Sequence, residues 1–490
     1  MTNYIIKNDI VKPFPHYWEK CIGSCRAYTA LREDYRQQIK KAHDELGFEY
    51  IRFHGLFNDD MSVCTSPLSP DPKLATKIVY NFANIDNIFD FLLSINMRPF
   101  IELGDMPSCI ARDKTSCFSY HMHTSPPVSN QKWSDLIKEF VCHLCDRYGS
   151  DEISHWFFEV WNEPNNSMFW QGTQKEYFTL YETTAKTIKS IDERFKVGGP
   201  ATACNMWIPE FIERCKSKQI PLDFITTHHY PTDETLWKEG SYSFEAMLKL
   251  ILSGKKRTFN RDIMRQMAEL ARTQAQDYPL YYTEWSISSS GEDSLHDDAY
   301  AAAMAAKILI DNSGLVNGYS YWTFSDIFEE CYQKPLPYHG GFGLLNYYGI
   351  PKAIYRCFEA FHNSGTEKLY VASDQPEHSH TGLIATRVEY GIQIIAYNYS
   401  TPYEKALSEA IKIELPAQFA EAKFSYYQID DVHCNSKYIW QQMGAPHYLS
   451  PKEVDVLKQK SNPSRQLLNK LELCLPPQSV TIIEVHHSQE

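Results

Sequence analysis

The chain has 490 residues, of which 43% are hydrophobic and 14% aromatic, and its net charge is −13. This apolar content supports one large core plus a second, smaller domain, and it argues against a disordered chain. Because the excess acidic charge repels phosphate groups, we expect neither nucleic acid nor an anionic membrane surface as a partner. Neutral polar ligands such as carbohydrates remain open, and aromatic rings suit sugar stacking, although most rings are expected to fill the core.

Cysteine use and the amino terminus bear on the compartment. The thirteen cysteines form no framework, and the one CxxC, at Cys142–Cys145, falls inside a helical pattern with no second pair to complete a zinc site. Free thiols at this density are typical of a reducing compartment. Residues 1–20 lack the apolar centre of a leader, and the apolar tract 299–310 contains Lys307 and is too short to span a bilayer. The sequence therefore favours a cytoplasmic protein without a membrane segment.

Short apolar runs typical of buried strands alternate along the chain with longer amphipathic segments typical of helices. The expected strands are 21–24, 49–57, 97–104, 156–163, 195–199, 223–230, 280–286 and 318–324. The expected helices are one beginning near Ala30 and 84–96, 133–148, 177–191, 207–218, 262–274 and 299–312. This alternation predicts an α/β fold, a (β/α)8 or TIM barrel. A doubly wound open sheet is the alternative, but no glycine-rich phosphate loop follows the first strand.

The pattern changes after Asn346. Residues 349–365 are expected to form a last helix, and beyond it apolar and polar residues alternate with a period of two, as in antiparallel strands. The alternating runs are 368–373, 381–389, 391–400, 410–416, 424–430 and 479–485. We therefore predict three parts. They are a strand in residues 1–14 that packs on the tail, a barrel over 15–346, and a final helix with a β-sandwich over 347–490.

Polar residues stand at the ends of several predicted barrel strands. They are Arg52 and His54, Asn162 and Glu163, His228, His229 and Tyr230, Glu284, and Trp322. Any one of them could be a strand end that meets solvent, but their joint occurrence favours a site, because barrel active sites lie at the carboxyl ends of the strands. Pro164 is expected to hold Glu163 in an extended backbone conformation.

Glu163 and Glu284 end the fourth and seventh predicted strands and so face one barrel mouth. Two carboxylates on either side of a glycosidic bond are the minimum machinery for cleaving it. A separation of about 5–5.5 Å gives retention of configuration, and about 6.5–9.5 Å gives inversion. The residues alone leave the stereochemistry open.

Six stretches, in order along the chain, resemble glycoside hydrolase family 39. They are IRFHGLFNDD, FFEVWNEPN, FITTHHYPTD, YYTEWS, YWTFSDIFEE and YHGGFGLLN, and the likeness runs from about Arg26 to Phe361. That family contains bacterial β-xylosidases and α-L-iduronidases. The resemblance implies a retaining glycosidase that cleaves a β-linked, xyloside-like sugar from an oligosaccharide or small glycoside, and it suggests that copies assemble through the β-rich tail. Several long loops favour a pocket and exo action. We expect no cofactor and no metal.

The resemblance also implies roles for individual side chains. Glu163 would be the acid/base and Glu284 the nucleophile. We expect the negative charge of Glu284 to raise the pKa of Glu163 by repulsion. The remaining expected contacts are Arg52 and Tyr230 to Glu284, Asn162 to the sugar 2-hydroxyl, His54 and His228 to other hydroxyls, Trp322 to the ring face, and Glu329 to a distal hydroxyl. Which member of the Glu329–Glu330 pair makes the last contact is open.

The chain departs from the β-xylosidase pattern after the third strand. Asp105 stands where that branch tends to have an aromatic residue, and His121 and His123 occupy the following loop. We expect these residues to border the sugar pocket, which leaves a galactoside, glucoside or arabinoside open as an alternative to a plain xyloside. The residues also leave open a carbohydrate-binding protein with little activity, an endo-acting enzyme, and a metal-dependent hydrolase that uses His54, His228 and His229.

Overall fold

Eight parallel strands close into a barrel in which each strand pairs with the next along the chain and the last pairs with the first. The computed structural model describes residues 1–490 except 67–69, 72, 74–76, 240–242, 253–259, 331–333, 335, 375–378 and 488–490. The barrel strands are β2 (Cys21–Arg26), β3 (Tyr50–His54), β6 (Arg98–Leu103), β9 (Phe157–Val160), β10 (Lys196–Thr202), β11 (Phe224–His229), β12 (Leu280–Trp285) and β13 (Gly318–Tyr321). The predicted barrel is confirmed, with most strands ending earlier than expected.

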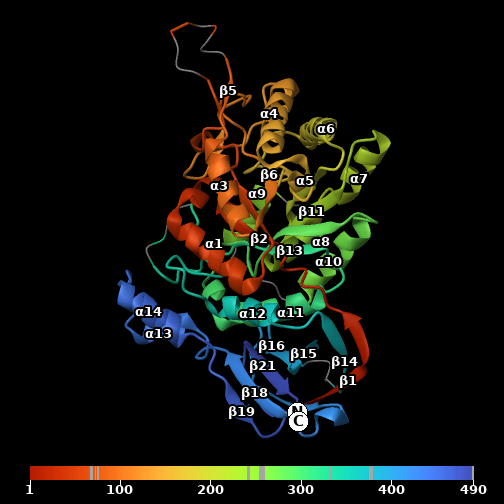
Figure 1. Ribbon diagram of the computed structural model, residues 1–490, viewed down its shortest axis with the longest axis vertical. Coiled ribbons are helices and arrows are strands. Elements are labelled where there is room, and N and C mark those ends of the chain that lie inside the picture. The colour runs from red at the N-terminus through yellow and green to blue at the C-terminus, as the bar shows by residue number, and fades with distance from the viewer. Residues whose placement is uncertain are drawn as a thin grey trace.

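Helices follow the barrel strands (Figure 1). They are α1 (Glu33–Leu46), α3 (Ala83–Ser94), α4 (Asn130–Tyr148), α5 (Ser150–Ile153), α6 (Gln174–Ile191), α7 (Ile208–Ser217), α8 (Glu234–Glu239), α9 (Phe244–Leu252), α10 (Ile263–Gln274), α11 (Ala299–Asp311) and α12 (Ala353–His362). Helices α8 and α9, which lie between β11 and α10, were not predicted from the sequence. The loops contain two short two-stranded sheets. They are β4 (Cys64–Thr65) with β5 (Val79–Tyr80), and β7 (Ser116–Cys117) with β8 (Met122–His123).

Aromatic side chains fill the barrel interior near the amino ends of the strands. One buried cluster contains Tyr50, Phe100, Phe157 and Phe224, with Tyr281 packed against it. The rings of Phe100 and Phe157 stack with centroids 4.8 Å apart. Because this end of the barrel is filled with apolar side chains, the polar groups of the strands gather at the opposite, carboxyl end.

The β-rich tail forms a nine-stranded sheet that is mostly antiparallel, in the order β19-β18-β21-β16-β15-β14-β1-β17-β20. Its strands are β1 (Thr2–Pro13), β14 (Glu367–Ser373), β15 (Thr381–Val388), β16 (Gly391–Asn398), β17 (Glu409–Glu414), β18 (Lys423–Ile429), β19 (Gln466–Leu468), β20 (Glu472–Leu475) and β21 (Ser479–His486). The N-terminal strand β1 lies inside this sheet, antiparallel to β14 and parallel to β17. A second hydrophobic core, which includes Tyr4, Ile394 and Ile483, covers one face of the sheet.

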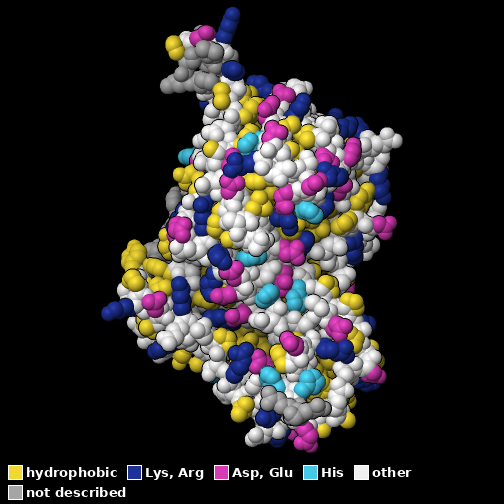
Figure 2. All heavy atoms as spheres, in the orientation of Figure 1, with side chains coloured by type: hydrophobic (Ala, Val, Ile, Leu, Met, Phe, Trp, Pro, Cys, Tyr) yellow, Lys and Arg dark blue, Asp and Glu magenta, His cyan; other side chains and the backbone are white. Residues whose placement is uncertain are grey.

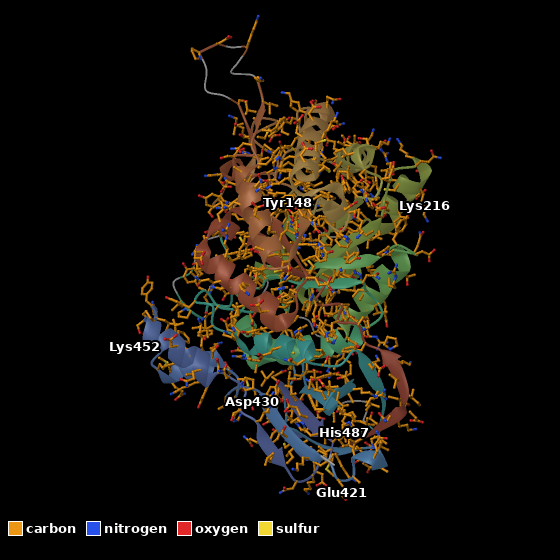
Figure 3. All side chains as sticks on the ribbon, viewed as in Figure 1. Tyr148, Lys216, Glu421, Asp430, Lys452 and His487 are labelled. Carbon is orange, nitrogen blue, oxygen red and sulfur yellow. The ribbon has the colours of Figure 1, made fainter. Side chains whose placement is uncertain are left out.

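Helices α11 and α12 lie between the barrel and the sheet (Figure 1). Residues Ala299–Leu309 of α11 are all buried, which explains why this helix is rich in alanine and apolar side chains on every face. Between β18 and β19 of the sheet, α13 (Ser436–Gln442) and α14 (Pro451–Lys460) form a short helical pair. Asp430 lies at the junction, where its Oδ1 accepts hydrogen bonds from the backbone of Val432 and His433 at 2.8 and 2.7 Å (Figure 3).

Basic and acidic side chains are interspersed over the face shown in Figure 2. Among the described residues, no helix combines the length and apolarity needed to cross a bilayer.

Candidate active site

The two predicted carboxylates meet at the carboxyl end of the barrel. Glu284 lies in β12, and Glu163 lies in the loop after β9. Both line one cavity of about 460 Å³. Glu163 is 6% exposed and Glu284 is 5% exposed, and an oxygen of each lies within 4.8 Å of the other. This short separation matches the geometry of retaining glycosidases and is below that of inverting ones.

The backbone at Glu163 differs from the expectation. Strand β9 ends at Val160, and Glu163 has a φ of +41°, so the prediction of an extended conformation before Pro164 was wrong. Two hydrogen bonds hold this turn: the Glu163 N–H donates to the Ala201 carbonyl at 2.8 Å, and the Asn166 N–H donates to the Glu163 carbonyl at 2.9 Å. Tertiary bonds to β10 thus outweigh the local preference that proline imposes.

Two donors fix the Glu284 carboxylate. Arg52 Nη1 donates to Oε1 at 2.8 Å, and the Tyr230 hydroxyl donates to Oε2 at 2.9 Å. Arg52 has no exposed surface and does not line the cavity, so it acts from below the site. A carboxylate that accepts two such bonds is held in one orientation, which is what attack on a sugar carbon requires.

Arg52 also binds two glutamates that the sequence analysis did not single out. Its Nε contacts Glu159 at 2.5 Å and its Nη2 contacts Glu102 at 2.9 Å, and both carboxylates are buried. Burial raises the pKa of Glu102 to about 8. The sequence did carry a signal for these two residues: each is a lone glutamate inside an apolar strand, in RPFIEL and in FFEV. A carboxylate buried in such a strand needs a cationic partner.

Glu163 is paired with His228. His228 Nδ1 lies 3.0 Å from Glu163 Oε1, and Asn166 Nδ2 donates to Oε2 at 3.1 Å. Burial favours the protonated acid, but the hydrogen bond and charge of His228 outweigh it, so the pKa of Glu163 lies below its ordinary value. The expectation of a raised pKa was therefore wrong, because the sequence does not reveal that His228 reaches this carboxylate. The expectation that His228 binds a sugar hydroxyl was also wrong, because this side chain is fully buried, lies outside the cavity lining and has both ring nitrogens in contact with Glu163 and Thr283.

His54 and Trp322 form one wall of the cavity. His54 Nδ1 lies 2.6 Å from Glu102 Oε2, and its ring centroid lies 4.7 Å from that of Trp322. Burial lowers the pKa of His54 to about 3, so the ring is neutral near neutral pH. Its Nε2 faces the cavity, 3.6 Å from Glu284 and 3.7 Å from Glu330. Asn162 lies beside this wall, accepting from Arg52 Nη2 at 2.9 Å while its own Nδ2 has no partner in the described part of the chain.

Comparison with known proteins agrees with this geometry. The model of "Glycosyl hydrolases family 39" matches residues 3–470. The chain belongs to glycosyl hydrolase family 39. It is 44% identical to a β-xylosidase of Caldicellulosiruptor saccharolyticus over 90% of this chain and 87% of that protein. It is 34% identical to one of Geobacillus stearothermophilus over 91% and 86%. A solved family-39 β-xylosidase from Caulobacter crescentus superposes with a TM-score of 0.82 at 32% identity, covering 99% of each chain.

Family membership makes the chain an O-glycosyl hydrolase, and two sequence-based expectations about its pocket need correction. Glu329 does not line the cavity, because its carboxylate pairs with Arg26 at 3.0 Å and with Arg32 at 3.5 Å. Glu330 lines it instead. Burial and the nearby Glu284 raise the pKa of Glu330 well above its ordinary value. The acidic group that faces the cavity is thus the second member of the pair.

The residues that depart from the β-xylosidase pattern also lie outside the cavity lining of this family-39 chain. Asp105 is fully buried and accepts a hydrogen bond from Asn58 Nδ2 at 3.1 Å. His121 is exposed, and His123 lies 3.4 Å from Asp59. The expectation that they border the sugar was wrong, because Asp105 is buried against Asn58, His123 contacts Asp59, and His121 is exposed outside the cavity lining.

Two groups of described residues have the spacing of metal ligands: Glu163 with His228 and Glu284, and His16 with Glu19 and His362. In the first group each donor atom already has a protein partner, and the Arg52 cation beside it disfavours a second cation. His229 points away from this group, with its Nε2 2.6 Å from the Tyr319 hydroxyl, so the adjacent histidines face opposite sides as the strand period requires.

Proposed function

We propose that this chain hydrolyses a terminal β-xylosidic bond with retention of configuration, using Glu284 as nucleophile and Glu163 as acid/base. The observation that carries the proposal is the approach of the two carboxylates to within 4.8 Å at the floor of one cavity. The β-xylosidases to which the chain is 44% and 34% identical support the choice of sugar.

In the first step the Glu284 carboxylate attacks the anomeric carbon while Glu163 donates a proton to the leaving oxygen. Arg52 and Tyr230 hold the Glu284 carboxylate in position for this attack. Glu159 fixes the arginine, because its carboxylate accepts a hydrogen bond from Arg52 Nε. The same carboxylate accepts a second hydrogen bond from the Thr283 hydroxyl at 2.8 Å. The result is a sugar bound covalently to Glu284 and an ionised Glu163.

In the second step Glu163 accepts a proton from water, which attacks the sugar and releases Glu284. His228 supports this change of role, because its hydrogen bond lowers the pKa of Glu163 and stabilises the carboxylate. Burial alone would lower the pKa of His228, but the charge of Glu284 and the bond to Glu163 raise it above its ordinary value. His228 therefore serves as a positioning residue for the acid/base.

We assign the sugar contacts from the free atoms around the carboxylates. His54 Nε2 and the Glu330 carboxylate line the cavity and are assigned to hydroxyls of the ring, and Trp322 is assigned to the ring face. Asn162 Nδ2 is assigned to the 2-hydroxyl because it is buried beside the carboxylates without a partner in the described part of the chain, although Asn162 does not line the cavity. A single cavity of about 460 Å³ that contains both carboxylates supports exo action on a terminal residue.

The thiol content supports a reducing, cytoplasmic setting for the enzyme. Assembly of copies through the nine-stranded sheet is a further expectation, and one solved relative from Caulobacter crescentus is described as monomeric. Light scattering of the purified protein distinguishes the two states.

The test is a set of aryl xylosides with good and poor leaving groups, together with xylo-oligosaccharides, assayed with the wild type and with Glu163→Ala. We expect the variant to lose about 10²–10⁴-fold in rate on poor leaving groups and much less on good ones, because only poor leaving groups need a proton. Equal losses on both kinds of substrate would contradict the acid role, and galactoside or glucoside turnover above xyloside turnover would contradict the choice of sugar.

A further inference from the structure

Two cysteines outside the active site lie unusually close together. Cys64 is in β4, Cys109 is in the loop after β6, and their sulfur atoms are 2.9 Å apart although the residues are 45 positions apart in the sequence. This distance is shorter than an ordinary contact between unbonded sulfurs and is less than about 1 Å longer than a disulfide bond. We propose that Cys64 and Cys109 are a modification site that forms a disulfide by exchange with a low-molecular-weight disulfide such as oxidised glutathione.

The backbone around the pair is already held in place. Ser108 N–H donates to Asp59 Oδ1 at 2.9 Å, which links the two segments next to the cysteines. Val63 and Ile110, which neighbour the two cysteines, are both fully buried in the same hydrophobic core. Bond formation therefore needs small rotations of two side chains rather than a rearrangement of the loops, which is the usual obstacle to a disulfide.

The two thiols differ in a way that suits exchange. Cys109 is partly exposed, whereas Cys64 is 4% exposed. The hydrogen bond from the Cys64 thiol lowers the pKa of Cys109, which increases the thiolate fraction of the sulfur that a reagent reaches first. Cys64 then lies within reach of the sulfur that has reacted.

The exchange proceeds in two displacements. The Cys109 thiolate attacks one sulfur of oxidised glutathione, which forms a mixed disulfide and releases one glutathione thiolate. The Cys64 thiolate then attacks the Cys109 sulfur, which forms the protein disulfide and releases the second glutathione. Two electrons and two protons pass from the protein thiols to the reagent, which is reduced to two thiols.

The bond would tie the β4–β5 ladder to the loop after β6 and close a loop that contains α3 and β6. A cross-link of this kind stabilises the fold mainly by restricting the unfolded chain. Neither cysteine lines the active-site cavity, so we expect turnover to change less than twofold. The inference therefore stands or falls independently of the proposed function.

The experiment treats the folded, full-length protein with oxidised glutathione, quenches it with acid, counts thiols in denaturant and maps the peptides. The expected result is a loss of two thiols, a Cys64–Cys109 cross-linked peptide, a rise in melting temperature of a few degrees, and full reversal by dithiothreitol. In Cys64→Ser the reaction should stop at the mixed disulfide between Cys109 and glutathione. In Cys109→Ser, Cys64 should remain unmodified. Cys142→Ser, which removes a half-buried thiol from α4, should behave as the wild type.

Three outcomes would overturn the inference. They are retention of both thiols by the wild type, a stable glutathione adduct on Cys109 that Cys64 does not displace, and a cross-link from either cysteine to a different partner. Because the readout is thiol chemistry and mass, loss of enzymatic activity in any variant leaves these outcomes distinguishable.

Discussion

At the scale of single residues, the site depends on how protons are distributed among neighbouring acids. Arg52 supplies one buried cation to Glu159, Glu102 and Glu284. Three ionised carboxylates around one cation would leave buried excess charge, and the raised pKa of Glu102 relieves part of it by keeping that group protonated near neutral pH. Glu102 then hydrogen-bonds to His54, and the Arg52 cation is shared between Glu159 and Glu284.

This distribution of protons predicts a pH effect of His228. Because the hydrogen bond and charge of His228 lower the pKa of Glu163, His228→Gln should raise it, and Glu163 should keep its proton to a higher pH. We expect the basic limb of the kcat/KM profile to move to higher pH by about one unit.

The measurement is a pH–rate profile on a substrate with a poor leaving group. An unmoved or downward-shifted basic limb would contradict the assignment, whereas a merely structural role of His228 would lower the rate at every pH without moving the limb. Thr283→Val, which removes the hydroxyl on the other ring nitrogen of His228 at 3.1 Å, should shift the limb less.

At this scale the sequence predicted several residues of the site and two of their bonds, those from Arg52 and Tyr230 to Glu284. Glu163, Glu284, His54 and Trp322 were predicted because polar or aromatic groups at the ends of apolar strands stand out, and all four line the cavity. The partner of Glu163 and the choice between neighbouring glutamates could not be predicted, because a one-position difference in a loop decides which side chain faces inward.

At the scale of elements, a buried ion cluster holds the cavity wall that contains Gly341 and Phe342. Lys352, just before α12, lies 2.7 Å from both Asp297 and Asp326 and donates to the Gly341 carbonyl at 2.9 Å. Lys352 has no exposed side-chain surface. The segments that contain Asp297, Asp326 and Gly341 thus contact one ammonium group. This contact holds in place the loop whose residues Gly341 and Phe342 line the cavity.

Removing this ammonium group should be costly. Lys352→Met leaves two buried carboxylates without a partner, so we expect a loss of about 3–5 kcal/mol in the free energy of unfolding and a lower kcat/KM. Denaturant unfolding and steady-state kinetics measure both. Lys20→Met, which removes a lysine that is paired with Glu49 and partly exposed, is the matched control and should cost less than about 1 kcal/mol. Equal effects of the two changes would contradict the role of the cluster.

The elements themselves were the most predictable level. The eight barrel strands and their main helices follow from apolar runs and amphipathic periodicity, which local sequence records directly. Helices α8, α9, α13 and α14 were not predicted. The sequence does carry signals for two of them, because α9 is amphipathic and α14 begins with a capping box between Ser450 and Glu453 and a proline at its first position.

At the scale of the whole molecule, the first strand connects the two ends of the chain. Strand β1 lies between β14 and β17, and its residues Tyr4 and Ile6 are 3% and 2% exposed within the second core. The chain segments before and after the barrel thus lie in the same sheet. Helix α11 of the barrel packs against that sheet. Stability of the tail therefore depends on residues that precede the barrel.

A pair of substitutions in β1 tests this dependence. Ile6→Ala should lower the free energy of unfolding by about 2–5 kcal/mol, because it opens a cavity in the second core. Ile5→Ala, at a neighbouring position that is 43% exposed, should cost less than about 1 kcal/mol. Thermal and denaturant unfolding of both variants provide the comparison, and similar costs at the two positions would show that β1 is dispensable for the core.

The most direct measurement of the central claim is covalent trapping with an activated 2-deoxy-2-fluoro-β-xyloside, followed by peptide mapping. The two facing carboxylates predict that one fluorosugar attaches to Glu284 in the wild type and that Glu284→Gln remains unlabelled. Labelling of a different carboxylate, or turnover without a covalent intermediate and with inversion at the anomeric carbon, would contradict the account.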